Sequence, residues 1–134
     1  MGKETGAVIN SFRDLRVWQT GMNLVESVYR ITQALPKSEL YGLTGQMRRA
    51  AVSVPSNIAE GHVREHLKEY LQHIAMAQGS LAELQTQFEI AYRLGYIAQS
   101  DFQELSGLAT ALAKQLYCLR NALASKSSVP VSVP

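Results

Sequence analysis

The chain has 134 residues, of which 46% are hydrophobic and 18% charged, and its formal net charge is +2. These values fit one globular domain, and the mild charge does not indicate a dedicated nucleic-acid domain, which concentrates basic residues on one face. The single cysteine, Cys118, excludes an internal disulfide, and no apolar run approaches the ~20 residues that cross a bilayer, so we expect a cytoplasmic protein without a membrane segment.

The first predicted helix spans residues 12–35, after a flexible N-terminus of residues 1–10. Ser11 and Asp14 form a helix-start signal, and Pro36 ends the helix. Apolar residues form two adjoining stripes that cover about half of the helix surface, more than one bundle core uses. One stripe contains Leu15, Trp18, Met22, Val25 and Tyr29, and the other contains Val17, Leu24, Val28, Ile31 and Leu35.

The second predicted helix spans residues 38–61, and we expect Pro55 to bend it. Its apolar residues fall in one arc of about 100°, and a second, polar arc lies apart from the first. This polar arc carries amide, hydroxyl, guanidinium and carboxylate groups, which form hydrogen bonds of fixed geometry. Such a face suits a packed polar contact, within the chain or between chains. The polar arc consists of Gln46, Arg49, Ser53, Ser56, Asn57 and Glu60.

The third and fourth predicted helices, residues 66–94 and 100–124, carry apolar residues at alternating spacings of three and four. Gly79 lies within the third helix, which suggests that another backbone passes close by, and Gly95 is suited to a left-handed helix cap. Short links between four helices predict an all-α, antiparallel up-down-up-down four-helix bundle over residues 11–124. Residues 125–134 are expected to form a flexible tail.

Five segments give the chain a family resemblance: Phe12–Gln19, Glu39–Leu43, Gln46–Ala51, Asn57–Gly61 and Gly79–Glu83. Their residues, order and spacing resemble the bacterial four helix bundle protein family. Members of that family were first noticed as reading frames within intervening sequences of large-subunit ribosomal RNA genes. The resemblance covers nearly all of the chain from residue 12 to about residue 123.

The resemblance implies a ring of five four-helix bundles. It extends more distantly to the accessory variability protein of diversity-generating retroelements, which is similar in architecture and serves a reverse transcriptase and its RNA. Ordinary members have no settled biochemical role, so the resemblance implies a fold and an assembly but no activity. One local departure is His66, which stands where relatives tend to have serine at the start of the third helix.

A histidine motif, His62-x-x-Glu65-His66, matches the H-x-x-E-H pattern of zinc proteases. On one continuous helix, His62, His66, Glu69 and His73 would share a face and could bind a metal. The family comparison instead places the motif at the junction of the second and third helices, where the two histidines need not face the same way. A zinc-dependent hydrolase therefore stays a remote alternative, and we expect no catalytic residue, metal or cofactor.

The arginines of the second helix suggest two different roles. Arg49 belongs to the polar arc, and its expected partner is a carboxylate, either Glu83 or Glu60 of a neighbouring subunit. Arg48 is expected to point outward, and with other basic residues it would form a patch if the helix ends cluster; scattered surface residues are the alternative. The candidate nucleic-acid-binding residues are Arg13, Arg16, Arg48, Arg64 and Lys68.

The sequence leaves two main candidate functions. The extra apolar stripe and the packed type of polar arc predict a non-enzymatic, ring-forming homo-oligomer, and the resemblance makes it a pentamer. The alternative is salt-sensitive, sequence-nonspecific binding of RNA or DNA by the assembled ring. No small-molecule substrate is predicted. The predicted residues of the oligomer interface are Val17, Leu24, Val28, Ile31, Gln46, Arg49, Ser53, Asn57 and Glu60.

Overall fold

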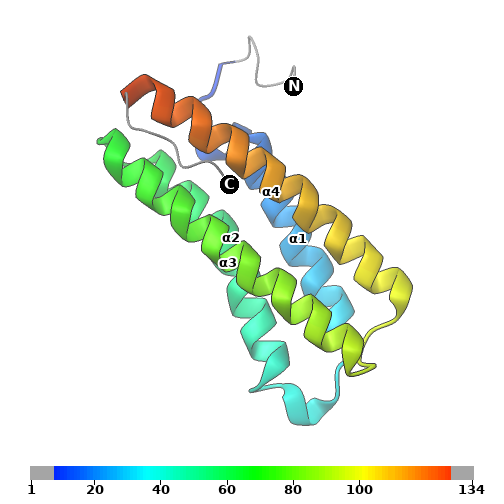
Figure 1. The fold of residues 1–134 in the computed structure, drawn as a ribbon. Coiled ribbons are helices and arrows are strands. Elements are labelled where there is room, and N and C mark those ends of the chain that lie inside the picture. The colour runs from blue at the N-terminus through cyan, green and yellow to red at the C-terminus, as the bar shows by residue number, and fades with distance from the viewer. Residues whose placement is uncertain (1–7, 128–134) are drawn as a thin grey trace.

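A computed structural model of the protein describes residues 8–127, and within this range the chain is helical with no strand. The long helices are α1 (Arg16–Thr32), α2 (Leu43–His62), α3 (Leu67–Arg93) and α4 (Gln99–Ser127), and the short 3₁₀ helices are η1 (Phe12–Asp14) and η2 (Lys37–Glu39) (Figure 1). The predicted all-α fold of four helices is confirmed. Of the termini predicted to be flexible, residues 1–7 and 128–134 lie outside the described range.

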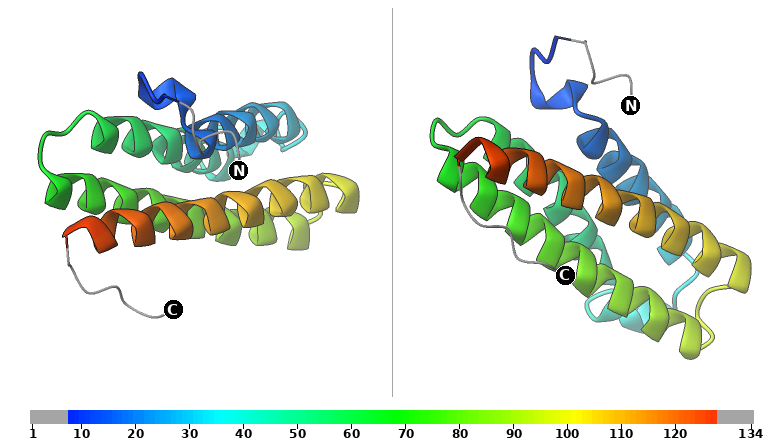
Figure 2. Two further views of the ribbon diagram at one scale, coloured as in Figure 1. Left: turned by 90° about the horizontal axis from the view of Figure 1, so that it is seen from above. Right: turned by 45° about the horizontal axis from the view of Figure 1, so that its top comes forward.

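The helices form two layers, α1 with α2 and α3 with α4 (Figure 2). Neighbouring helices run in opposite directions, as the contacts between α1 and α2 show. Gly21 of α1 lies against Pro55 in the second half of α2, whereas Thr32 at the end of α1 contacts Arg48 near the start of α2. Among the helices of the described residues, none is long and apolar enough to cross a membrane.

The core follows the periodicity of α3 and α4. The predicted apolar positions of α3 from Ile74 to Ala91 are buried, and those of α4 from Leu105 to Leu116 face them. Gly95 has φ of 75° and Tyr96 N–H donates to the carbonyl of Ala91 at 2.9 Å, which confirms the predicted left-handed cap at the end of α3. The apolar positions that the spacing predicted in α3 and α4 therefore form much of the core of the bundle.

Two helix starts differ from the predicted boundaries. Ser11 and Asp14 form a complete capping box, but it caps η1, because Leu15 is extended (φ −75°, ψ 128°) and separates η1 from α1. The second long helix begins at Leu43, several residues after the predicted start, because residues 37–42 form η2 and a turn. Pro55 lies inside α2 without ending it.

Two glycines, Gly21 and Gly61, lie at contacts between helices, and of the two only Gly61 leaves no room for a side chain. A Cβ atom at Gly21 would lie 3.4 Å from the Pro55 Cβ, and one at Gly61 would lie 2.8 Å from the His73 Cβ, inside any normal contact distance. The close backbone predicted beside Gly79 is not found within the described chain, because a Cβ there would meet no atom within 4 Å. The helix crossing that needs a glycine is thus at the end of α2 and the start of α3.

Candidate interaction surface

The polar arc of α2 is largely turned against α3. The hydroxyls of Ser53 and Ser80 lie 2.8 Å apart, and the amide of Asn57 donates to the Ser53 carbonyl at 2.9 Å. The Asn57 Oδ1 lies 3.0 Å from the Nδ1 of His73, and the Glu60 carboxylate lies 3.7 Å from the same nitrogen. These contacts lie within one subunit, and Asn57, 8% exposed, has little surface left for a neighbour, which corrects its assignment to a contact between subunits. The side chain of Glu60 is 58% exposed and Ser53 lines two surface pockets, so a contact of these two residues with another subunit stays a prediction.

The N-terminal part of the same arc is open. Gln46 and Arg49 line a polar pocket of about 260 Å³ together with Glu83 of α3. Among the described residues, Arg49 has no hydrogen bond or ion pair, so the predicted pair with Glu83 does not form within the subunit. Glu83 instead accepts a hydrogen bond from the side-chain amide of Gln87 at 3.3 Å. A contact of Gln46 and Arg49 with a neighbouring subunit stays a prediction.

The predicted interface residues of α1 belong to the core. Val17, Leu24, Val28 and Ile31 are between 0% and 5% exposed, so they have almost no surface left for another subunit. This corrects their assignment to an oligomer interface. The physical reason is that two apolar stripes lie side by side on α1, and the stripe that also contains Gly21 is the one packed into the core. Helical periodicity predicts both stripes but not which one faces inward.

The other apolar stripe of α1 faces out. Together with the outer side of α2 it lines a pocket of about 330 Å³ between the two helices. Its side chains are mostly half-buried, and Val52 is 40% exposed. We call this the apolar pocket; it is lined by Trp18, Met22, Val25, Val52, Pro55, Ser56 and Ala59.

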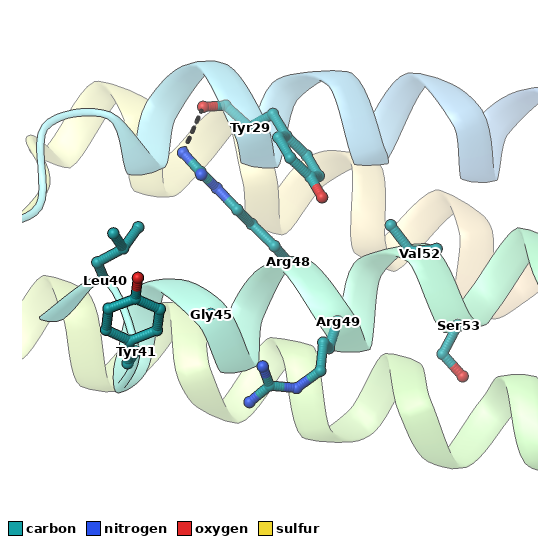
Figure 3. A pocket seen from close by; sticks show the side chains of 8 residues that line it. All are labelled: Tyr29, Leu40, Tyr41, Gly45, Arg48, Arg49, Val52 and Ser53. Carbon is teal, nitrogen blue, oxygen red and sulfur yellow. Dashed lines mark hydrogen bonds between the residues drawn. The ribbon is translucent and has the colours of Figure 1, made fainter.

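A second, wider pocket of about 680 Å³ continues from the first, because Val52 lines both. Here α1, the link after η2 and the start of α2 come together (Figure 3). Figure 3 shows Arg48 reaching up to α1 and Arg49 pointing the other way, toward α3. The two pockets together form what we call the α1–α2 face. The second pocket is lined by Tyr29, Leu40, Tyr41, Gly45, Arg48, Arg49, Val52 and Ser53.

Arg48 is tied to the C-terminal end of α1. Its Nε donates to the Thr32 hydroxyl at 3.0 Å, and its Nη2 donates to the Tyr29 carbonyl at 3.4 Å. The guanidinium also lies 4.7 Å from the centre of the Tyr29 ring. A cation at this position complements the negative end of the α1 dipole. Arg48 is therefore half-buried and engaged within the subunit, which corrects the expectation that it points outward.

The predicted basic patch divides into two regions. Arg13 and Arg16 at the start of α1 lie at the same end of the bundle as Arg64 and Lys68, because α1 and α2 are antiparallel. Arg48 lies roughly 20 Å along α2 from that end. The Arg13 guanidinium packs 4.7 Å from the ring centre of Phe12. Acidic residues are mixed with the four basic ones at this end: Asp14, Glu60, Glu65 and Glu69.

The link between η2 and α2 is built around one carboxylate, that of Glu39. Its Oε1 accepts from the backbone N–H of Leu43 at 3.0 Å, and its Oε2 accepts from the Tyr96 hydroxyl at 3.0 Å. The hydrogen bond to Glu39 raises the pKa of Tyr96, with partial burial and the negative charge adding to the effect. A Cβ at Gly42 would lie 2.8 Å from the Glu39 carboxylate, so a side chain there would have to displace this carboxylate from its hydrogen bonds. Its result is that Tyr41 is held away from the bundle, 93% exposed.

The histidine motif lies at the junction of α2 and α3, as predicted. His62 ends α2 and its Nδ1 lies 3.3 Å from the Tyr70 hydroxyl, whereas His66 is exposed at the residue before α3. Among residues 8–127, no three His, Cys, Asp or Glu side chains are grouped so that they could bind a metal. The motif therefore contributes to the packing of the junction.

Sequence reasoning missed the contribution of the link. Leu40 and Tyr41 line the wider pocket beside Tyr29, yet they attracted notice only through the family resemblance. A signal was present: two large apolar residues directly before Gly42 stand in a connection, where polar residues are the usual choice. Periodicity could not find them because they lie outside the helices.

One comparison with known proteins identifies relatives of the chain. The family model described as "23S rRNA-intervening sequence protein" matches residues 13–118, which is most of the chain and includes all of α1, α2 and α3. No curated protein matches the chain.

Proposed function

This chain belongs to the 23S rRNA-intervening sequence protein family, and from that premise we propose that it is a non-enzymatic scaffold that assembles with copies of itself through the α1–α2 face. The single observation that carries the proposal is the outward-facing apolar stripe of α1, which continues across α2 into two connected pockets.

The composition of this face supports an interface. Trp18 and Met22 are half-buried, and Tyr29, Leu40 and Val52 are exposed, although the core beneath them is already filled. Large apolar patches on a monomer mark sites of association, and aromatic residues and methionine are enriched at the centres of interfaces. Arg49 and Gln46 at the edge of the face would supply the polar rim that such an interface has.

A ring is the proposed form of the assembly, and five is the proposed number of subunits. The number comes from the family resemblance and not from the geometry of the subunit. A ring requires that one surface of each subunit bind a different surface of the next, since such a head-to-tail contact closes when the rotation divides the circle.

Binding of RNA or DNA is the alternative, and it has less support. Arg48 is occupied by α1, and the four basic residues at the other end of the bundle are accompanied by four acidic residues. Phosphate binding depends on a local excess of positive charge, which this mixture reduces. The apolar α1–α2 face is the stronger feature, so the scaffold is the function that we propose.

The test compares substitutions at two valines, Val52 within α2 and Val63 directly after its last residue. Val52→Glu places a charge in the middle of the α1–α2 face, and Val63→Glu is the matched control, because Val63 is 66% exposed but lies outside both pockets. Light scattering after size-exclusion chromatography is expected to give an oligomer for the natural chain and for Val63→Glu. Val52→Glu is expected to give monomers with unchanged helicity in circular dichroism.

A natural chain that remains monomeric on concentration would overturn the proposal. If Val52→Glu still forms the oligomer, the chain associates with copies of itself, but through a surface other than the α1–α2 face.

A further inference from the structure

We propose that Tyr41 of one subunit inserts into the apolar pocket of a neighbouring copy of the chain. This inference rests on the proposed function, because it names the contact by which the copies associate. Tyr41 is 93% exposed, and the apolar pocket is an unfilled space of about 330 Å³ between α1 and α2.

Tyr41 is presented by a turn whose backbone is held by hydrogen bonds on both sides. The Glu39 carboxylate binds the first N–H of α2 and the Tyr96 hydroxyl, and the Gly42 N–H donates to the Glu39 carbonyl at 2.9 Å. A carbonyl contact also constrains Gly45, where a Cβ would lie 2.9 Å from the Leu40 oxygen. A backbone that is ordered before binding loses less conformational entropy when its side chain is buried in a partner. Exposed aromatic side chains, which have few rotatable bonds, are typical anchors of interfaces.

The apolar pocket has the size and chemistry to receive a phenol ring. A cavity of about 150 Å³ is enough to hold benzene, and this pocket is about 330 Å³. Trp18 offers an aromatic wall and Met22 a flexible one, both suited to contact with a ring. The polar lining residue is Ser56, whose hydroxyl can bond to the hydroxyl of tyrosine.

The occupant must come from another copy. Tyr41 precedes α2, and the lining residue of the apolar pocket that is nearest to it along that helix, Val52, lies nine residues after the first residue of the helix, Leu43. At a rise of 1.5 Å per residue this separation is about 14 Å, roughly twice the length of a tyrosine side chain. Tyr41 therefore cannot fill the pocket of its own subunit, and each subunit carries both a projecting group and an unfilled site.

A projecting group and a receiving site at different places on the subunit define a contact between unlike surfaces. Each copy can then give Tyr41 to one neighbour and receive Tyr41 from another, which is the arrangement that closes into a ring. If two copies exchange these groups reciprocally, the result is a dimer. Measuring the number of subunits therefore distinguishes a ring from a dimer, and crosslinking tests the Tyr41 contact itself.

The contact is tested by photo-crosslinking. p-Benzoylphenylalanine at position 41 retains an aromatic group, and this reagent reacts readily with methionine, so the expected product joins position 41 to the segment that contains Met22. Mixing isotopically heavy and light chains shows by mass spectrometry whether the crosslink joins two copies. The control carries the same reagent at position 117, because Tyr117 of α4 is also exposed at 38% but is not part of the α1–α2 face.

Crosslinks from position 41 to residues of the apolar pocket in a second copy support the inference. Crosslinks from an intact oligomer that reach other surfaces, or that join residues within one copy, overturn it while leaving self-association in place.

Substitutions provide an independent measurement. Tyr41→Ala is expected to raise the dissociation constant of the assembly roughly thirtyfold, as loss of an anchor residue does, whereas Tyr41→Phe and Tyr117→Ala change it less than about threefold. Ala59→Phe, which fills the pocket from within, is expected to weaken the assembly as Tyr41→Ala does. Equal affinities of Tyr41→Ala and the natural chain would refute the inserted tyrosine, and a natural chain without any assembly would refute the scaffold itself.

Discussion

The two sides of α2 differ in how completely they are closed. Toward α3, serine, asparagine and histidine side chains form hydrogen bonds across the seam, and Gly61 lets the backbones approach closely. Toward α1, Gly21 lies against Pro55, but the surface above this contact stays open as two pockets lined largely by apolar groups. Ser53, Asn57 and Glu60 thus have partners on α3, whereas Arg49 beside the polar pocket and the apolar groups toward α1 have surface left for another molecule.

This difference reverses a common intuition about polar and apolar surfaces. A polar arc next to a core is often taken to be the exterior, and an apolar stripe to be the interior. Here Asn57 of the polar arc is buried, and Val52 on another side of the same helix is exposed. Buried polar groups require partners in fixed geometry, and α3 supplies them. An apolar stripe has no such requirement, so it can remain at the surface until a partner covers it.

The largest expected effect is a difference in stability between substitutions at two adjacent residues of α1, one in each apolar stripe. Leu24→Ala removes a fully buried side chain and is expected to reduce the free energy of unfolding by about 2–5 kcal/mol. Val25→Ala, on the half-exposed stripe, is expected to cost less than about 1 kcal/mol, since little area is lost and alanine favours the helix. Urea denaturation at one fixed protein concentration measures both. Equal losses would show that the stripes are equally buried in solution.

The next effect tests the close approach of α2 and α3. Gly61→Ala is expected to reduce the free energy of unfolding by about 1–3 kcal/mol, because the new methyl group would overlap the His73 Cβ. Gly79→Ala is the matched control within α3. It meets open space, so it is expected to increase the free energy of unfolding by up to about 1 kcal/mol. Thermal and urea unfolding of the two variants should therefore shift in opposite directions.

A loss of stability in Gly79→Ala would contradict this prediction and would place a neighbouring copy against α3.

The smallest effect concerns the turn that holds Tyr41. The neutral Tyr96 hydroxyl donates to Glu39, so folding favours the protonated phenol and raises its pKa. The hydrogen bond therefore stabilises the folded protein at pH values below the pKa of Tyr96 in the unfolded chain. This stabilisation is lost as the pH rises through the higher pKa of Tyr96 in the folded protein. Glu39→Gln removes the negative charge and is expected to lower the pKa of Tyr96. Ultraviolet titration of phenolate measures the shift, and Tyr96→Phe identifies which transition belongs to this residue.

The fold was predictable because it depends on local patterns. The spacing of three and four in α3 and α4 defines their buried faces, and a glycine at position 95 identifies the cap between them. Helix starts were less predictable, because Leu15 and the turn after η2 adopt non-helical backbone although their neighbours continue the apolar pattern. Tertiary contacts, such as those of Glu39 with Tyr96, determine these boundaries.

The candidate surface was only half predictable. The sequence indicated that α1 has one apolar stripe more than a single core uses, but it assigned the buried stripe to the interface, because helical periodicity does not reveal which stripe faces inward. It also did not indicate that Ser53, Asn57 and Glu60 contact α3 of the same subunit, because their partners there, such as Ser80 and His73, are many residues away in sequence.

The spacing of residues along each helix was enough to predict a four-helix bundle with more apolar surface than one core uses. The packing of the helices settles which stripe of α1 is covered, which polar groups of α2 have partners, and that Tyr41 projects from the turn before α2 while a pocket between α1 and α2 stays open. The physical reason is that periodicity fixes the angle between residues on one helix, whereas the rotation of that helix in the bundle depends on where neighbouring backbones can approach most closely.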